Sequence, residues 1–373
     1  MARILIFSRD PGGANAVAPL AQPLRAEGHE VMLYGKDSAL AKYREHGERG
    51  LDIMQEQAEI SQKSVCAFVA DKQPRLVLTG TSADDLTEKY MWRAAGQLGI
   101  GSIAVLDQWV NYGLRFSPYG VAEADKFDRD RRIEYMPAKI CVMDELARTE
   151  AEADGIDPAR LAVTGQPYFE TLLKKTDASQ GPTLRSRLGI AAGEKLLMFV
   201  SEPICDTYRE TDGSGHYWGY TERTIFRAVL EAAEALSESM PGRLTIMVRH
   251  HPKEKRGNFA DIIGCARGGC RVIVDSGALA RDAIDAADLV VGMSSMLLLE
   301  AAVLGRPVLS VQIGLRRRNP FVLCRMGSLQ PVTDPAGLVQ ALKSGLVGGG
   351  RATAFHFIRD PVARVLQEAR KFL

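Results

Sequence analysis

The sequence predicts a two-domain α/β protein in which each domain is a doubly wound parallel sheet. Three observations support this prediction. Short apolar runs rich in β-formers alternate with longer helical patterns through most of the chain, as in successive βαβ units. The length of 373 residues suits two domains of ordinary size. A polar segment with Gly and Pro, Lys174–Pro182, interrupts the rhythm near the middle and is predicted to be the linker.

The first domain is predicted to span residues 1–175 and to contain six strands. Helical patterns between the strands include Asn15–Glu27 and Asp84–Leu98. The strands are predicted at Arg3–Phe7, Glu30–Tyr34, Arg75–Leu78, Ser102–Leu106, Lys139–Val142 and Leu161–Val163.

The second domain, residues 183–353, repeats the same rhythm. The segment that follows it, residues 354–373, has apolar side chains at helical spacing and no strand pattern, so it is predicted to be a separate C-terminal helix. The strands of the second domain are predicted at Leu196–Val200, Leu244–Val248, Arg271–Val274, Leu289–Val291 and Pro307–Val311.

Composition and charge exclude several classes of function. Hydrophobic residues make up 46% and charged residues 25% of the chain, which is ordinary for a soluble globular protein. The formal net charge of +1 argues against a nucleic-acid partner, which usually requires a strongly basic surface. No apolar run is long enough to span a bilayer, and the N-terminus lacks the pattern of a signal peptide. We therefore expect a cytoplasmic protein without a transmembrane segment, either a monomer or a homodimer.

A serine pair in the second domain indicates an anion site. Ser294 and Ser295 stand between a buried strand and a predicted helix, Met296–Leu304. Two hydroxyls beside the unpaired N–H groups of a helix N-terminus suit a phosphate. Glu300 lies on the same helix and could accept hydrogen bonds from ribose hydroxyls. In the alternative interpretation, Ser294 only caps the helix and Glu300 is a surface residue.

A second polar group in this domain follows the predicted strand Leu244–Val248. The strand delivers Arg249 and His251 at its carboxyl end, and Pro252 stops it. Open α/β sheets bind ligands at this end of their strands. His251 could bond a ligand phosphate or act as an acid on a leaving phosphate, and Arg249 adds positive charge. Glu202, at the end of the domain's first strand, is predicted to lie in the same site. In the alternative interpretation, His251 is a structural residue whose hydrogen bonds are satisfied within a loop.

The first strand of the chain is followed by Asp10, Gly12 and Gly13, before a helix predicted to open at about Asn15. Backbone without a Cβ atom can approach a pyrophosphate closely, so both glycines are candidate ligand contacts. The spacing does not match GxGxxG, so dinucleotide binding is not predicted.

A polar and aromatic segment after a later strand of the first domain indicates an acceptor site. The strand ends at Asp107, and Trp109, Asn111 and Arg115 follow. Aromatic faces stack on sugars, while Asn and Arg bond hydroxyls or carboxylates. A carboxylate is needed to take a proton from an attacking hydroxyl, and Asp107 is the first candidate for this base and Asp10 the second. In the alternative interpretation, Asp107 caps a turn and Trp109 packs in the core.

The order and placement of two short motifs resemble known nucleotide-sugar enzymes. Bacterial sialyltransferases and capsule polymerases carry an HP motif and a later SS motif that contact the donor, here His251-Pro252 and Ser294-Ser295. CDP-glycerol phosphotransferases look similar. UDP-N-acetylglucosamine 2-epimerases share the segment type seen at Glu300–Leu309, but their Thr-Glu-Arg-Pro-Glu stretch is replaced here by Arg316–Pro320.

The resemblance implies a GT-B fold, in which two Rossmann-like domains face a cleft and residues 354–373 pack back on the first domain. It implies an inverting glycosyltransferase for surface glycans or glycoconjugates. The expected donor is a CMP-linked nonulosonic acid or another donor that carries CMP or CDP. The acceptor would be a glycan, a lipid-linked molecule or a protein. The alternatives are a UDP-N-acetylglucosamine 2-epimerase and a non-catalytic nucleotide-sugar binding module.

The resulting site prediction has three parts. No cofactor is expected because the nucleotide-sugar is a substrate, and no metal is expected because helix N-termini and His or Arg contacts can stabilise a leaving phosphate. The catalytic residues are predicted to be Asp107, His251 and Asp10; the donor-binding residues Gly12, Gly13, Glu202, Arg249, His251, Pro252, Ser294, Ser295 and Glu300; and the acceptor-binding residues Trp109, Asn111 and Arg115.

Overall fold

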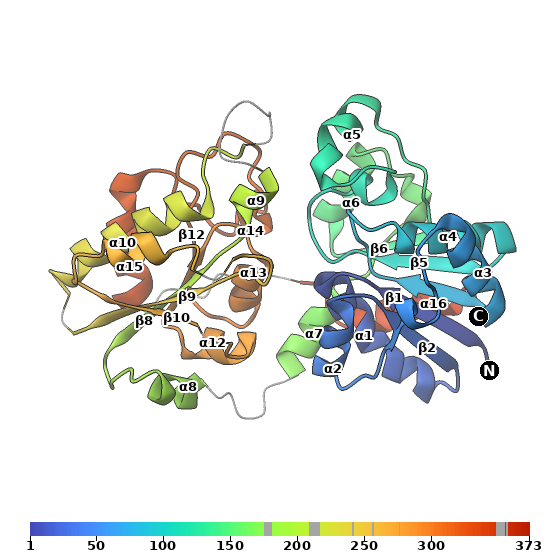
Figure 1. Cartoon of the computed structure of the whole chain (residues 1–373), viewed down its shortest axis with the longest axis horizontal. Coiled ribbons are helices and arrows are strands. Elements are labelled where there is room, and N and C mark those ends of the chain that lie inside the picture. Colours follow the sequence, from blue (N-terminus) through green and yellow to red (C-terminus); the bar gives the residue numbers. More distant parts are fainter. Residues whose placement is uncertain are drawn as a thin grey trace. The chain divides into compact units, whose positions relative to one another are not determined.

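The computed structural model of the chain divides into two compact units, which are described one at a time (Figure 1). Unit 1 comprises Met1–Lys174 and His356–Leu373, and unit 2 comprises Lys175–Phe355. Most of the predicted linker, residues 175–180, lies outside the described residues. The structure describes residues 1–174, 181–208, 217–240, 242–255, 257–275, 277–347, 355 and 357–373.

Unit 1 is built on a seven-stranded parallel sheet. The strand order is β3-β2-β1-β4-β5-β6-β7, so the chain runs outward in one direction from β1 and then returns to add β4 on its other side. The point between β1 and β4 is where such sheets bind ligands, beyond the carboxyl ends of the strands. The strands are β1 (Arg3–Ser8), β2 (Glu30–Gly35), β3 (Leu51–Asp52), β4 (Leu76–Thr79), β5 (Gly101–Val105), β6 (Lys139–Val142) and β7 (Leu161–Val163).

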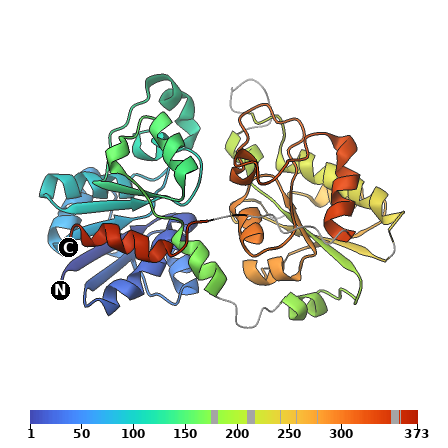
Figure 2. The same cartoon turned by 180° about the vertical axis from the view of Figure 1, so that it is seen from behind.

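Helices cover both faces of this sheet. The buried side chains of β1 alternate between the faces: Ile4 and Ile6 pack with α1 and α16, and Leu5 and Phe7 pack with α3 and α4. The C-terminal helix α16 therefore belongs to the core of unit 1, and Figure 2 shows it in red along this unit. The helices are α1 (Pro11–Ala26), α2 (Ala39–Glu45), α3 (Gln62–Lys72), α4 (Thr87–Leu98), α5 (Ala124–Asp130), α6 (Glu145–Ala153), α7 (Pro167–Lys174) and α16 (Pro361–Arg370).

Unit 2 repeats the architecture with five parallel strands. Their order is β10-β9-β8-β11-β12, so the equivalent switch point lies between β8 and β11. The strands are β8 (Lys195–Val200), β9 (Leu244–Arg249), β10 (Arg271–Val274), β11 (Leu289–Gly292) and β12 (Val308–Ser310). The helices are α8 (Gly181–Arg187), α9 (Ile204–Tyr208), α10 (Glu222–Ser237), α11 (Ala260–Gly264), α12 (Ala280–Ala286), α13 (Met296–Val303), α14 (Val322–Arg325) and α15 (Pro335–Val347).

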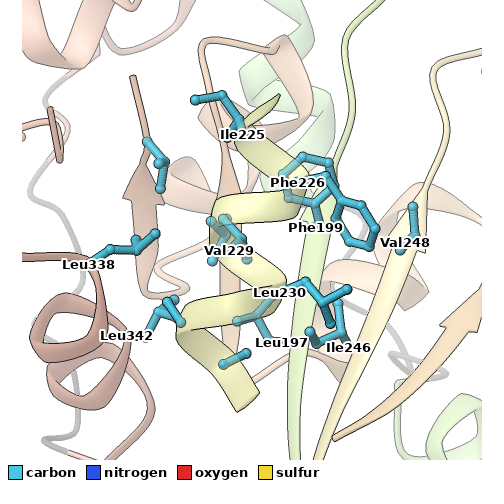
Figure 3. Packing of buried hydrophobic residues seen from close by; sticks show 14 of the residues in the cluster. Leu197, Phe199, Ile225, Phe226, Val229, Leu230, Ile246, Val248, Leu338 and Leu342 are labelled. Carbon is cyan, nitrogen blue, oxygen red and sulfur yellow. The ribbon is translucent and has the colours of Figure 1, made fainter. Parts of the chain in front are cut away.

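The core of unit 2 lies under α10. This helix places Phe226 and Val229 over the apolar side chains of β8 and β9, among them Phe199 and Val248 (Figure 3). Thr221 caps the helix through a reciprocal bond with Thr224, which fixes where α10 begins. The core therefore holds β8 and β9 rigidly, and their carboxyl ends carry several of the predicted site residues.

The predicted fold class is confirmed, and one predicted boundary near the site is wrong. Helix α1 begins at Pro11 and not at about Asn15, because Pro11 occupies the first helical position after the extended residue Asp10. Gly12 and Gly13 therefore lie in the first turn of the helix and not in a loop before it. Among the described residues, no helix has the length and apolar character needed to cross a membrane.

Candidate functional site

In unit 2, the residues predicted to bind the donor gather at the switch point. Glu202 follows β8, and Ser294 follows the neighbouring strand β11. The Glu202 carboxylate accepts hydrogen bonds from the Ser294 backbone N–H at 2.6 Å and from the Ser294 hydroxyl at 2.8 Å. Burial raises the pKa of Glu202 to about 7, against the opposing effect of the N–H groups of Ser294 and Ser295. A carboxyl group that changes charge near neutral pH therefore occupies this corner.

The serine pair opens helix α13 as predicted. Ser295 is the N-cap, and its hydroxyl accepts the Leu298 N–H at 3.1 Å. Glu300 is buried within the same helix. Two kinds of group suited to an anion therefore meet here, the positive end of a helix dipole and a hydroxyl. Ser294 and Ser295 both have internal partners, so a phosphate at this point would have to share or exchange those bonds.

The His-Pro corner after β9 is held by a residue that the sequence reading missed, Glu254. The Glu254 carboxylate accepts the His251 backbone N–H at 2.6 Å and the Ser201 hydroxyl at 2.7 Å. The Glu254 N–H in turn donates to the His251 carbonyl at 2.9 Å, so the turn closes on itself. The sequence pattern that could have revealed this role is a Glu three residues after His251, with Pro252 between them, because this spacing is typical of a capped turn. Glu254 thereby fixes the backbone of His251 next to Ser201 at the end of β8.

His251 is a neutral hydrogen-bond donor in this arrangement. Its Nδ1 accepts the backbone N–H of Lys253 at 3.2 Å, which places the ring proton on Nε2 in the neutral form. Burial, together with the charge of Lys253, lowers the pKa of His251 to about 4. The ring therefore suits donation to a phosphate oxygen better than transfer of a proton from an imidazolium.

Two other residues of this corner have different surroundings. The Arg249 guanidinium bonds the Asp275 carboxylate and the Ala278 carbonyl, so it holds the loop after β10. Pro252 is exposed beside the histidine. His250 points elsewhere and stacks on Phe259, with ring centroids 5.2 Å apart.

In unit 1, Asp10 and the two glycines lie at the switch point between β1 and β4. A Cβ atom on Gly12 would lie 1.8 Å from Oδ2 of Asp107, and one on Gly13 would lie 2.6 Å from the Ser8 hydroxyl. The glycines thus let the first turn of α1 pack closely on its neighbours, whereas donor contact by either of them stays a prediction. The Asp10 side chain is partly exposed and pairs with Arg9 at 2.8 Å.

Asp107 is buried in an ion pair with Arg115. The two residues are 4% and 5% exposed, and the Arg115 Nη1 atom lies 3.0 Å from Asp107 Oδ1 and 2.8 Å from both oxygens of Thr81. Burial raises the pKa of Asp107, although the Arg115 charge acts against the increase. A carboxylate covered by Gly12 and neutralised by Arg115 is poorly placed to take a proton from an acceptor. Asp10, the second candidate for the base, is partly exposed, whereas Asp107 is buried.

The residues predicted to bind the acceptor have surroundings that differ from those expected. Trp109 is buried, its Nε1 donates to Asp144 at 2.6 Å, and its ring stacks on Phe169. Its ring therefore belongs to the core of unit 1, which is the alternative interpretation of this residue. Arg115 is fully engaged within the protein. Asn111 adopts a left-handed backbone with φ of 59° and is partly exposed.

The described residues hold no group of three His, Cys, Asp or Glu side chains that could bind a metal ion.

A further buried carboxyl group, on Glu88 of α4, lies beside Asp10 in unit 1 and was not predicted from the sequence. Its sequence context, a polar helix start, gave no sign of burial.

Comparison with solved structures identifies the fold. UDP-GlcNAc 2-epimerase from Methanocaldococcus jannaschii matches with a TM-score of 0.69 and 12% identity, over 100% of both chains. The Neisseria meningitidis UDP-GlcNAc 2-epimerase bound to UDP-GlcNAc matches at 0.67 and 12%, over 99% of this chain and 100% of that one. A glycosyltransferase from Rickettsia africae matches at 0.57 and 10%, over 100% and 93%. These similarities establish the GT-B type fold.

A search of curated proteins finds no match. The family profile of CDP-glycerol:poly(glycerophosphate) glycerophosphotransferase matches residues 124–317, which is just over half of the chain and includes both the His-Pro corner and the serine pair. The chain therefore belongs to the CDP-glycerol:poly(glycerophosphate) glycerophosphotransferase family.

Proposed function

We propose that the protein transfers a group from a cytidine-nucleotide donor to an acceptor hydroxyl and releases CMP. Membership of the glycerophosphotransferase family is the observation that carries this proposal. Two donors fit it. With CDP-glycerol, the acceptor oxygen attacks the phosphorus next to glycerol. With a CMP-linked nonulosonic acid, it attacks the anomeric carbon with inversion. CMP leaves in both reactions, and the family favours the first.

In the proposed mechanism, unit 2 binds the leaving nucleotide. The Nε2–H of His251, the N-terminus of α13 and the serine pair would bind its phosphate, and Glu300 would bind ribose. The His251 N–H, the serine hydroxyls and the N-terminus of α13 place positive potential where negative charge develops, so no metal is required in the proposal. In unit 1, Asp10 would accept the proton of the acceptor hydroxyl. The acceptor is proposed to be a glycan, a lipid-linked molecule or a protein.

Nucleotide selectivity tests the donor site. We expect CDP and CMP to raise the melting temperature of the protein, and equal concentrations of UDP and GDP to raise it less, because ligands that bind the folded state stabilise it. Differential scanning fluorimetry measures the shift. Selective stabilisation by UDP would contradict the cytidine assignment.

Product analysis then separates the reactions. CMP release from CDP-glycerol in the presence of acceptor supports glycerophosphate transfer, and CMP release from CMP-N-acetylneuraminic acid supports sugar transfer. Conversion of UDP-GlcNAc to UDP-N-acetylmannosamine, or with water to N-acetylmannosamine and UDP, would support the second candidate, a 2-epimerase, which the fold of the similar solved structures favours. Arg316–Pro320, where such enzymes usually carry a different stretch, argues against that candidate.

The titration of Glu202 gives this site a pH dependence. A phosphate at α13 is repelled by ionised Glu202 and tolerated by the neutral acid, whose pKa is about 7. Binding of CDP-choline, whose two phosphates keep a fixed charge, should therefore weaken by about fivefold to tenfold between pH 6.5 and pH 8. His251 stays neutral throughout this range because its pKa is about 4.

Isothermal titration calorimetry measures this effect, in buffers of different ionisation enthalpy that reveal proton uptake. The Glu202→Gln variant keeps the shape of the side chain and should bind with nearly the same affinity at both pH values. An equal pH dependence in the variant and the natural protein would rule out Glu202 as its source.

A further inference from the structure

A buried carboxyl group in unit 1 has no part in the proposed mechanism. Glu88 lies on α4 and is 0% exposed. Its Oε1 accepts the backbone N–H of Arg9 at 3.3 Å, whereas Oε2 has no hydrogen-bond partner among the described residues. The residue thus reaches from α4 to the turn after β1, one position before Asp10.

The charged groups around Glu88 form no ion pair with it among the described residues, although the Glu88 charge raises the pKa of Lys89 against the larger effect of burial. Carboxylates of Asp10 and Asp85 face it, and so does the buried Tyr43 hydroxyl. The neighbouring cations bind other partners. Lys36 pairs with Asp85 at 2.7 Å, and Lys89 donates to the carbonyls of Ala83 and Tyr119. The Arg9 guanidinium pairs with Asp10 and Asp37.

An ionised carboxylate in this position would be very unfavourable. Burying a charge without a counter-ion and with one oxygen unbonded is so costly that the group takes up a proton instead. Consistent with this argument, burial and the nearby Asp10 and Asp85 charges raise the pKa of Glu88 to about 8, against the opposing N–H groups of Arg9 and Ser82. At neutral pH, Glu88 is therefore mainly a neutral acid beside a partly exposed aspartate.

We propose that Glu88 is a positioning residue for Asp10: as a neutral acid it anchors the Arg9–Asp10 turn and leaves Asp10 as the ionised carboxylate at this end of β1. The chemical role of Asp10 rests on the proposed function, but the coupling of the two carboxyls does not. When Glu88 loses its proton, a second negative charge appears next to Asp10. The environment of Asp10 then changes in a way that a purely structural glutamate would not produce.

The coupling is tested by titration, without any substrate. Protein labelled with ¹³C at the aspartate carboxyl carbons is followed by NMR from pH 4 to pH 10, and the Asp10 signal is assigned with Asp10→Asn. We expect the Asp10 signal to show a step near pH 8 that arises from Glu88. Glu88→Gln keeps the acceptor for the Arg9 N–H and should abolish this step. Glu150→Gln, at another buried glutamate of unit 1, should leave it intact.

Infrared spectroscopy provides a second readout. In the Glu202→Gln background, which removes another carboxyl group that titrates near neutral pH, a protonated carboxyl band should be present at pH 7 and lost when Glu88→Gln is added. If this band is absent, or if the Asp10 step near pH 8 persists in Glu88→Gln, the proposal is wrong. If Glu88→Gln fails to fold, the titration of the band in Glu202→Gln decides alone. A midpoint of the band below pH 6 would then show that Glu88 is ionised at neutral pH and would overturn the proposal.

The consequence for turnover is tested separately. In a Glu202→Gln background with saturating donor, CMP release should fall by about fivefold between pH 8 and pH 9 as Glu88 ionises, and much less when Glu88→Gln is added. Absence of CMP release in every protein would refute the proposed function and leave the coupling established by NMR. An identical decline in both proteins would refute the role of Glu88 in turnover.

Discussion

Replacing Arg115 by methionine is expected to destabilise unit 1 by about 3–5 kcal/mol at pH 7. Methionine fills much of the space of the aliphatic stem but removes the partner of Asp107, which is 4% exposed. It also leaves both oxygens of Thr81 without the donor that binds them at 2.8 Å. A buried charge left alone is the main reason for the large effect, since most single substitutions are milder.

The measurement is urea unfolding, followed by tryptophan fluorescence in a Trp218→Phe background. In that background the remaining tryptophans, Trp92 and Trp109, both report on unit 1. The control is the double variant Arg115→Met with Asp107→Asn, which removes the charge and should recover much of the lost stability. The loss in the single variant should also shrink as the pH falls and Asp107 takes up a proton. A single variant as stable as the natural protein would show that Asp107 is not ionised in the fold.

Most strands were predictable from the sequence because they are buried on both faces. Such strands appear as continuous apolar runs, and the one over Lys139–Val142 was predicted at the observed bounds. The edge strands Leu161–Val163 and Arg271–Val274 are partly exposed and were also predicted at the observed bounds. The short strand Leu51–Asp52 was missed, since two residues carry no periodicity. The start of α1 was misplaced because Gly12 and Gly13 look like a loop, whereas Pro11 already sets a helical φ.

The location of the site was predictable to the level of strand ends. In a parallel sheet all carboxyl ends meet at one edge, so polar residues after β1, β5, β8, β9 and β11 had to lie at these edges. The partners of each side chain were not predictable. Glu202 and Ser294 are 92 residues apart and meet only because β8 and β11 are neighbours in the sheet.

Burial was the other property that the sequence did not reveal. A tryptophan after a strand suits sugar stacking and core packing equally, and the position of Phe169 decides in favour of the core for Trp109. A glutamate in a polar helix start suits the surface, yet Glu88 faces inward because α4 packs its first turn against the end of β1. Buried polar residues such as Glu88 are therefore the part of the candidate site that only the structure reveals.

His251→Ala is expected to lower the rate of CMP release by about 10²- to 10³-fold, because a donor aimed at developing negative charge is removed. The fold should persist, since the backbone N–H of residue 251 still binds Glu254 and closes the turn. His251→Gln keeps an N–H donor of similar reach and should recover part of the rate. His29→Ala, at the amino end of β2, is the matched control and should leave the rate unchanged.

The pH profile distinguishes hydrogen bonding from acid catalysis by the same histidine. An imidazolium acid with an ordinary pKa would lose activity as the pH rises through about 6.5. His251 has a pKa of about 4, so its neutral form predominates from pH 5 upward and should give no such decline. Because Glu202 titrates near pH 7, the profile is best measured in Glu202→Gln with saturating donor. A decline near pH 6.5 that disappears in His251→Gln would show that binding of the donor raises the pKa of His251 and makes it the acid.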